Sequence, residues 1–457
     1  MDKCVMRVRR RLKAPPAAGW RCLTRTKCWL ALGSTLVVVL GAACSARAAQ
    51  APATVVVCPT CRFTSIKEAV RDAPAGSRIL VRGGYYHEGN IVVDKPLKIL
   101  GEGWPIVDGR GLSDVITVTA DDVSFSGFVV QHSGTGALGD PAGIKVSKVR
   151  GCVIENNRVL DDLFGIYLAV STDCEVRNNL VRGHTISASF GGNAIHLWNC
   201  SHVVVENNRV SGYRDGLYFE FLHDSAIVGN LSEHNLRYGM HTMYSADNSY
   251  RDNILRNNQA GEVLMYSKRL LVTGNRIEHN WGAACYGALL KGLDDSRLER
   301  NLFLHNSVGL YAEDSNHNTL AENKFLGNGI AARVLADSDG NRFTDNVFDA
   351  NTFDVATNSS KTSDNSFDGN YWSSYRGYDL NRDGIGDVPY HPVALFTVLA
   401  ENYPATMVLL RSPFAELLQV AERAIPLLTP KALADTEPLM RRPSWSKSVT
   451  FASASAR

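Results

Sequence analysis

Two cysteines separated by two residues, Cys58 and Cys61, have a spacing that could do chemistry. A Cys-x-x-Cys pair suits a soft metal ion or a redox-active dithiol. The strand–helix–strand context of a thioredoxin-like motif is missing here. In an oxidising compartment such a pair forms a structural disulfide. We therefore predict a disulfide, with copper(I) binding by the reduced thiols as the alternative.

A second set of metal-type residues lies near the end of the chain. Asp379, Asn381, Asp383 and Asp387 place oxygen ligands at alternate positions around Gly384, which is the opening of a calcium loop. The glutamate expected at the twelfth position is missing, since Tyr390 stands there. A structural calcium site is one interpretation of this segment, and a plain turn is the other.

A repeated sequence pattern predicts the secondary-structure elements that position these residues. A phrase of the type Gly-apolar-Tyr/His recurs at 165–168, 216–219, 239–242 and 309–312. An asparagine followed by an apolar residue recurs with it, at Asn157, Asn179, Asn208, Asn230, Asn253, Asn275, Asn301, Asn323 and Asn346. Most intervals are roughly 22 residues, a period typical of solenoids. Apolar residues alternate with polar ones within each unit, which indicates strands.

The repeat predicts an all-β fold: a right-handed parallel β-helix with an N-terminal cap and a C-terminal helical extension. Stacked coils supply the core that one coil cannot, and the asparagines should form an inward ladder at one corner. The predicted segments are a signal peptide (1–48), the cap and first coils (49–150), the repeats (151–370), a calcium-loop segment (371–392), a helical docking segment (393–440) and a disordered tail (441–457). A short helix at 65–70 would form the cap, and helices are expected at 393–403 and 413–428.

The repeat also predicts which side chains face outward. If Ile166 and Leu217 point into the core, their neighbours point out. A first outer column would hold Tyr167, His196, Tyr218, His241 and Tyr311, and a second outer column Trp198, Glu220, Met243, Met265, Lys291 and Glu313. Exposed aromatic and Met groups indicate contact with another molecule, and His and Met can ligate copper. The candidate partner-binding or copper-binding residues are His196, Trp198, Glu220, His241, Met243 and Met265. Coverage by the chain's own loops, such as the insertion around Ser187, is the alternative.

The charge balance and the N-terminal signal limit the classes of function that this protein can have. Ten of the 48 Lys and Arg residues, but only one of the 46 acidic residues, lie in 1–48, so the remainder has 38 basic and 45 acidic residues. It is not built as a nucleic-acid binder. The basic start, the apolar stretch to Ala43 and Ala46-Arg47-Ala48 predict a cleaved secretory signal and a periplasmic protein. Cys152 and Cys174 stand five places before ladder asparagines and should stack, either as inert thiols or as a disulfide.

Several segments, some within the repeat and others outside it, resemble the NosD family. They include Asp162–Leu168 (DLFGIYL), Gly192–Asn199 (GNAIHLWN), Arg237–His241 (RYGMH), Leu264–Leu270, Gly369–Asp379, Asp383–Tyr390 and Leu410–Phe414. The resemblance covers about residues 62–443, and the Cys58–Cys61 pair departs from it. It implies a periplasmic β-helix subunit that works with an ATPase and a membrane permease of ABC type. It further implies a role in maturing the copper centres of nitrous-oxide reductase, with the apo-reductase and a copper-carrying lipoprotein as partners. Membrane contact would come only through the permease, with the C-terminal helices on that side.

An enzyme is the competing interpretation, because some β-helices act on carbohydrates. Hydrolysis needs two carboxylates about 5–10 Å apart across one groove. The candidate acids are Asp161, Asp162, Asp215, Glu220, Asp294 and Asp295. Most stand at predicted corners, and we expect no Arg or His in the neighbouring turns to support them. No phosphate-binding Gly-Lys-Ser/Thr loop is present, so energy would come from the partner ATPase. The sequence favours a non-catalytic accessory protein over a carbohydrate-active enzyme or sugar-binding module.

Overall fold

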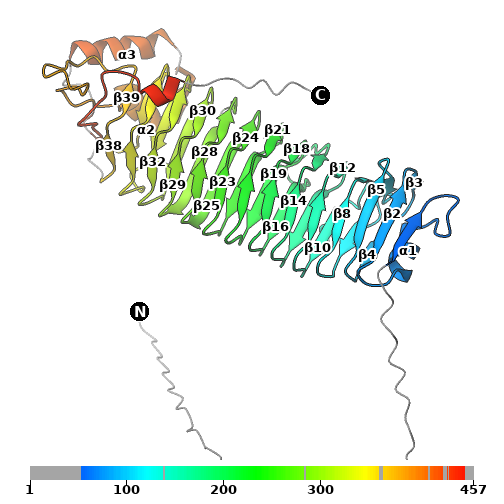
Figure 1. Cartoon of the computed structure of the whole chain (residues 1–457). Helices are drawn as coiled ribbons and strands as arrows, with labels where there is room; N and C mark the ends of the chain where they lie inside the picture. The colour runs from blue at the N-terminus through cyan, green and yellow to red at the C-terminus, as the bar shows by residue number, and fades with distance from the viewer. Residues whose placement is uncertain are drawn as a thin grey trace, which may run out of the picture. The chain divides into compact units, whose positions relative to one another are not determined.

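The computed structural model describes residues 53–136, 139–282, 285–359, 364–409, 412–425, 430 and 432–447. The predicted signal peptide lies outside these residues, as do residues 448–457 of the predicted tail. Within them the chain winds into right-handed coils of three strands, and every strand pairs in parallel with its counterpart in the next coil (Figure 1). The predicted parallel β-helix is therefore confirmed. None of the helices in these ranges is long and apolar enough to cross a lipid bilayer.

Three sheets run along the described coils. The 14-stranded sheet contains β1 (Thr54–Val57), β2 (Arg78–Arg82), β5 (Lys98–Glu102), β8 (Ser124–Ser126), β11 (Val153–Glu155), β14 (Glu175–Arg177), β17 (Val204–Glu206), β20 (Ala226–Val228), β23 (Ser249–Arg251), β26 (Leu271–Thr273), β29 (Arg297–Glu299), β32 (Thr319–Ala321), β35 (Arg342–Thr344) and β38 (Ser366–Asp368). The 13-stranded sheet contains β3 (Tyr85–Tyr86), β6 (Ile106–Asp108), β9 (Val129–Gln131), β12 (Arg158–Leu160), β15 (Leu180–Arg182), β18 (Arg209–Ser211), β21 (Leu231–Glu233), β24 (Ile254–Arg256), β27 (Arg276–Glu278), β30 (Leu302–Leu304), β33 (Lys324–Leu326), β36 (Val347–Asp349) and β39 (Tyr371–Trp372). The 12-stranded sheet contains β4 (Ile91–Val93), β7 (Ile116–Val118), β10 (Ala142–Ser147), β13 (Phe164–Ala169), β16 (Asn193–Trp198), β19 (Asp215–Glu220), β22 (Tyr238–Met243), β25 (Ala260–Lys268), β28 (Tyr286–Asp294), β31 (Val308–Glu313), β34 (Ile330–Val334) and β37 (Phe353–Ala356).

The core is a column of stacked apolar side chains. In β13, Ile166 and Leu168 point inward and are fully buried, whereas Tyr167 between them points outward. Like side chains stack coil on coil, as in the parallel rings of Phe303, Phe325 and Phe348, whose centroids are 4.7 and 4.8 Å apart. Stacking at the normal strand spacing lets each coil bury the apolar face of the next.

A buried asparagine ladder follows one inner corner, as predicted. The Asn253 side chain donates to Ile227 O at 3.0 Å and to Asn275 Oδ1 at 3.0 Å, and the same pattern repeats along the coils. The ladder ends at Asn370, whose side chain donates to Asp435 Oδ2 at 3.0 Å. Each coil is therefore tied to the next by polar groups that water cannot reach.

A helix covers the N-terminal end of the coils. Helix α1 (Ile66–Asp72) buries Ile66, Ala69 and Val70 against them. The carboxylate of Glu88 accepts from the first free N–H groups of the helix, those of Ile66 at 2.9 Å and Lys67 at 2.8 Å. The predicted cap is confirmed, and it shields unpaired backbone groups of the first coil.

The C-terminal segment folds against the last coils. It contains α2 (Leu395–Asn402), the 3-10 helix η1 (Pro404–Leu409), α3 (Pro413–Ala424) and the 3-10 helix η3 (Ser444–Lys447). Helix α3 was predicted to continue to Leu428, but residues 426–429 lie outside the described ranges. Residues 441–447 were predicted to be disordered. They instead contact the coils, because Arg442 pairs with Asp349 at 2.9 Å and Lys324 lies over the Trp445 ring.

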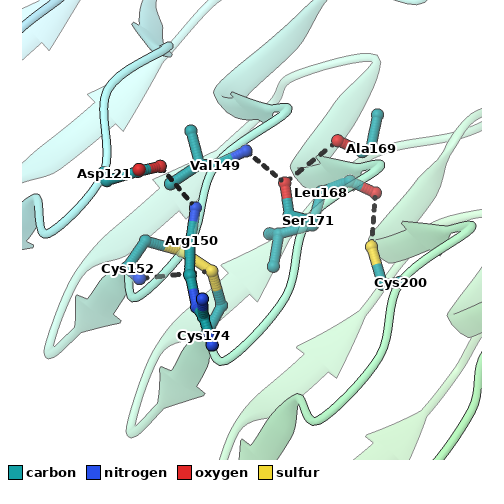
Figure 2. The surroundings of a disulfide bond; sticks show 9 residues. All are labelled: Asp121, Val149, Arg150, Cys152, Leu168, Ala169, Ser171, Cys174 and Cys200. Carbon is teal, nitrogen blue, oxygen red and sulfur yellow. Dashed lines mark hydrogen bonds between the residues drawn. A yellow bond between two sulfur atoms is a disulfide. The ribbon is translucent and has the colours of Figure 1, made fainter. Parts of the chain in front are cut away.

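Two disulfides occur in the described part of the chain. Cys58 and Cys61 are bridged within one turn, with Cα atoms 5.0 Å apart. Figure 2 shows the other, which joins Cys152 and Cys174 in consecutive coils. Both of these sulfurs are buried, so this disulfide joins two neighbouring coils from inside. Cys200, drawn beside it in Figure 2, is also buried, and burial raises the pKa of its thiol to about 11.

Candidate functional site

The second outer column stands in register on the outer face of the 12-stranded sheet. Trp198 pairs with Glu220, Glu220 with Met243, Met243 with Met265, and Met265 with Lys291. Trp198 is 38% exposed, and Glu220, Met243 and Met265 are half-buried. The sequence therefore placed these four side chains correctly, and they form a continuous outward stripe across four coils.

Three further aromatic residues widen this stripe. Phe221, Tyr244 and Tyr266 each follow a member of the second outer column by one residue, and we call them the corner aromatics. They are 39%, 44% and 44% exposed. Their rings stack in sequence, with centroids 5.4 and 5.2 Å apart. Sequence reasoning missed them, because it treated the corner as a turn.

The backbone at the corner aromatics is unusual for such large side chains. All three have left-handed φ angles, of 53°, 49° and 50° respectively. Most left-handed corners of this molecule carry Asn, Asp, His or Gly, the residue types that tolerate the conformation best. Bulky residues held there store strain, and strain of this kind concentrates at functional sites. The signal available in the sequence was a run of aromatic residues where Asn or Asp was expected.

The first outer column is in register as predicted, and its members are half-buried except for His241, which is buried. His241 is only 5% exposed, because Tyr218 and Tyr238 pack edge-on against it with centroids 5.0 and 4.9 Å away. Val263 and Leu289 continue the column beyond it. His241 therefore belongs to a packed column beside the exposed stripe on the same face of the sheet, and the prediction that it is accessible was wrong.

A buried carboxylate lies beside His241. Asp215 is fully buried, and its Oδ2 lies 3.5 Å from His241 Nδ1 and 3.5 Å from Arg214 Nε. Arg237 Nε is 4.0 Å from the other carboxylate oxygen. The expectation that no acid has an Arg or His in the neighbouring turns was therefore wrong. Two guanidinium groups lie close enough to offset the charge of Asp215, but neither of its carboxylate oxygens has a hydrogen-bond partner among the described residues.

His196 is likewise enclosed. Its ring stacks between Tyr167 and Tyr218, with centroids 4.4 and 4.6 Å away, and Asn193 Nδ2 lies 3.1 Å from its Nδ1. Burial, assisted by the positive charge of Arg214, lowers the pKa of His196 to about 3. The imidazole is neutral at physiological pH. It therefore contributes packing beside Trp198 and Glu220 rather than a positive charge.

In both predicted metal motifs, the candidate ligand atoms already bond to other atoms of the same motif. The Cys58 and Cys61 sulfurs are joined, so copper(I) could bind there only after reduction. In the loop at 379–387, carboxylate oxygens of Asp379, Asp383 and Asp387 accept hydrogen bonds from backbone N–H groups of the same loop. The described residues contain no group of three or more His, Cys, Asp or Glu side chains arranged to hold a metal ion. The loop thus has the contacts of a self-contained turn, and calcium binding stays a prediction.

A groove of about 770 Å³ lies near the N-terminal coils, and sequence reasoning did not identify it. Its lining includes His87, Asp108, Arg110, His132, Ser133 and Asp161. Asp108 accepts hydrogen bonds from Tyr85, Gln131 and the Arg110 N–H, which hold the pKa of its carboxyl far below the usual range despite burial. Asp161 contacts the imidazole of His184. Asp108 is therefore ionised and unsuited to donate a proton, although an ionised carboxylate suits the base or nucleophile of a hydrolase.

The fold and the exposed stripe together define a class: a parallel β-helix protein that exposes aromatic and methionine side chains on one sheet. Residues 178–377 match the family model described as "Periplasmic copper-binding protein (NosD)". The chain is 33% identical over 381 residues to a "Probable ABC transporter binding protein NosD" of Pseudomonas aeruginosa, covering 78% of this chain and 87% of that protein. A protein of the same description from Stutzerimonas stutzeri is 30% identical over 377 residues, with 78% and 86% coverage. The chain belongs to the NosD family.

Among solved structures the chain is similar to the crystal structure of the Dettilon tailspike protein. The TM-score is 0.49 with 13% sequence identity, and the match covers 66% of this chain and 65% of that one.

Proposed function

We propose that this protein is a periplasmic, non-catalytic subunit of an ABC-type complex that matures the copper centres of nitrous-oxide reductase. Family membership and the names of its relatives, which describe copper binding and an ABC transporter, support the general role. The observation that carries the specific role is the exposed stripe of Trp198, the corner aromatics and the outward methionines. In this role the β-helix is a rigid platform for the apo-reductase and for a copper-carrying lipoprotein.

The stripe has the composition of a protein-binding surface. Aromatic and Met side chains are enriched in interfaces, and contiguous exposed apolar area usually marks one. Lys291 and Glu313 add charge at the edge beyond Met265 and pair with each other at 3.0 Å, whereas Glu220 lies within the stripe between Trp198 and Met243. An apolar centre with a charged rim is the arrangement found in specific interfaces. The rigid coils beneath keep these groups in fixed positions, which limits the entropy lost on binding.

Removing two of the exposed rings tests this face. The double variant Trp198→Ala and Tyr244→Ala is expected to weaken binding of the apo-reductase or of the copper carrier by about 30-fold or more, because central aromatic residues carry most interface energy. Affinities measured by surface plasmon resonance check this. Leu112→Ser, an exposed apolar residue outside the face, serves as the control and should bind normally. Unchanged affinity of the double variant for both partners would rule out the docking face.

The C-terminal helices offer a separate surface. Phe396 of α2 stacks on Phe353 of the last coil with centroids 5.2 Å apart, and Glu401 pairs with Arg333. Helix α2 thus covers the end of the coils. Helix α3 packs Ala415 and Leu418 onto this layer but leaves Phe414, Leu417 and Val420 exposed. We propose that this exposed face of α3 contacts the membrane permease.

Truncation after Tyr390 should abolish complex formation while leaving secretion intact. It would also remove Asp435, which accepts from Trp372 Nε1 at 2.8 Å, so a point variant is the sharper test. Leu417→Ser with Val420→Ser is expected to lower recovery of the permease and ATPase in co-purification by about tenfold, since both side chains are solvent-exposed and would be buried only by the partner. Glu416→Gln on the same helix is the control. Full recovery with the double serine variant would place the permease elsewhere.

We propose that a calcium ion bound by Asp379, Asn381, Asp383 and Asp387 has a structural role at the end of the coils. Calcium binding would raise the melting temperature, because a ligand that binds the folded state alone stabilises it. Melting curves with added calcium and with a chelator should then differ by several degrees. Superimposable curves would leave the loop as a plain turn.

The carbohydrate alternative now depends on the groove near the N-terminal coils. Its side chains suit hydrogen bonding to a polar ligand, and the ionised Asp108 could not be the proton donor of a hydrolase there. The platform role is favoured, because the exposed stripe and the family relationship support it independently.

A further inference from the structure

The groove near the N-terminal coils lies outside the exposed stripe, on a different sheet. His87, Arg110, His132 and Asp161 line it from four successive coils, because they stand at or just beyond the ends of β3, β6, β9 and β12. At about 4.8 Å per coil, these residues span roughly 14 Å along the axis. The volume of about 770 Å³ falls within the range of about 300–1,000 Å³ that ligand sites occupy. The groove is therefore large enough for an extended organic molecule.

One carboxylate organises the polar groups of this groove. The side chain of Asp108 is only 9% exposed. It accepts hydrogen bonds from the Tyr85 hydroxyl, from Gln131 Nε2 at 3.2 Å and from the Arg110 backbone N–H at 2.9 Å. Its fourth partner is His132 Nδ1 at 3.1 Å. These bonds hold the surrounding side chains in position before a ligand arrives, which reduces the entropy lost on binding.

The contact with Asp108 also decides which atom of His132 is available to a ligand. An ionised carboxylate only accepts hydrogen bonds, so His132 Nδ1 carries the hydrogen of this bond. Nε2 of the same ring is left for a ligand, and the His132 side chain is 48% exposed. The Arg110 guanidinium has five N–H donors, and one of its nitrogens, Nη2, donates to His87 O at 3.0 Å. The groove thus offers several hydrogen-bonding groups side by side.

An aromatic ring borders these polar groups. Tyr85 is 50% exposed, while its hydroxyl is engaged by Asp108. The His87 ring lies beside the Tyr85 ring, with centroids 4.5 Å apart. The Tyr85 ring therefore offers apolar surface next to hydrogen-bonding groups. A sugar ring matches this combination, because it presents C–H groups on its faces and hydroxyl groups around its rim.

The charges in the groove argue against two other classes of ligand. The described residues contain no group of three or more His, Cys, Asp or Glu side chains arranged for a metal ion, and the Asp108 carboxylate already accepts from four donors. The carboxyl groups of Asp108 and Asp161 face the same groove as the Arg110 guanidinium, so an anion would gain little net attraction. Hydroxyl groups both donate and accept, and they satisfy such a mixed lining without adding charge.

We propose that this groove binds a neutral oligosaccharide, with Arg110 and His132 bonding to its hydroxyl groups and the Tyr85 ring packing on one sugar face. Binding is non-covalent and reversible. The site is separate from the two docking surfaces, so it stands or falls independently of the proposed function. In the periplasm such a ligand has two sources, soluble glucans and the glycan strands of the cell wall.

Isothermal titration calorimetry of the secreted, disulfide-intact protein tests the ligand class and its source. The neutral probes are laminaritetraose, a glucan, and chitotetraose, which consists of the N-acetylglucosamine units found in cell-wall strands. We expect at least one of them to bind with a submillimolar Kd, and the one that binds more tightly identifies the source. The acidic tetramer of galacturonate should bind at least tenfold more weakly. Failure of both neutral probes to bind, or tighter binding of the acidic tetramer, would overturn the proposal.

Glycine variants test the location of the site. Arg110 and His132 both have φ 57°, which glycine adopts without strain, so the double variant Arg110→Gly and His132→Gly keeps the corner geometry. We expect this variant to bind the oligosaccharide at least tenfold more weakly. His305→Gly is the matched control, because His305 is exposed at a left-handed corner with φ 51° outside the groove, and it should bind normally. Circular dichroism checks that both variants fold. Unchanged affinity of the folded double variant would show that the sugar binds elsewhere and would overturn the site.

Discussion

Replacing Asn275 with alanine is expected to lower the free energy of unfolding by about 4 kcal/mol. Asn275 is fully buried in the asparagine ladder. Its Nδ2 donates to Tyr250 O at 3.0 Å and to Asn301 Oδ1 at 3.2 Å, and its Oδ1 accepts from Asn253 N and Nδ2. Alanine would leave several buried polar groups without partners, each worth about 1–3 kcal/mol. Urea unfolding followed by circular dichroism measures the loss.

The matched control for Asn275 is an asparagine outside the ladder. Asn207 is exposed at a left-handed corner with φ 54°, and glycine tolerates that conformation without strain. Asn207→Gly should change the free energy of unfolding by less than about 1 kcal/mol. If the two variants lost similar stability, the ladder would not have the structural weight assigned to it.

Replacing Glu262 with glutamine is expected to stabilise the protein at alkaline pH and to have little effect near pH 4. Glu262 points into the core between Met240 and Ala288, and neither carboxylate oxygen has a hydrogen-bond partner among the described residues. Burial raises its pKa to about 8. An unfolded chain releases this proton near pH 4.5. Stability is therefore fully present below that pH and falls as pH rises to about 8, by roughly 1.4 kcal/mol per pH unit at most. Melting temperatures of both proteins from pH 4 to pH 9 test this.

Glu278 is the comparison residue, because its substitution by glutamine is expected to lower stability instead of raising it. It is nearly as buried, but its carboxylate pairs with Arg276 at 2.6 Å. The Arg276 side chain is 29% exposed, so water partly solvates the charge that Glu278→Gln leaves behind, and losing the ion pair should lower the melting temperature only modestly. Equal pH dependence of the unmodified protein and the Glu262→Gln variant would show that Glu262 is ionised and solvated in the folded protein.

The parallel β-helix could be predicted from the sequence, because it follows from the repeat of roughly 22 residues. Once Asn253 and Asn275 are known to be one coil apart, the pairing of the intervening strands follows, and so does the alternation that turns Ile166 inward and Tyr167 outward. The second outer column was placed for the same reason. The period also places Glu262 one coil after Met240 at the same inward position, although a carboxylate is not expected in an apolar core.

The burial of the histidines was not predictable in this way. His241 is covered by ring packing from Tyr218 and Tyr238, and its neighbour Asp215 comes from a different coil. Such contacts depend on rotamers and on side-chain lengths across strands, which the repeat does not encode. The corner aromatics were missed for another reason. The backbone conformation at Phe221 and Tyr244 follows the corner geometry, and large side chains there contradict the usual residue preference.

Each coil adds the same rise along the axis of the β-helix, so the number of coils between two surfaces sets their distance along that axis. The exposed stripe ends at β25. Strands β28 and β31 of the same sheet lie between it and β34, where Arg333 pairs with Glu401 of α2. At about 4.8 Å per coil, this gives an axial offset of roughly 14 Å between β25 and β34. Deleting one repeat, such as residues 301–322, would shorten the offset by a single step of about 4.8 Å and still allow the remaining ladder to close. The distance between the two proposed interfaces can therefore change only in whole coils, so any partner that touches both must match an integer number of them.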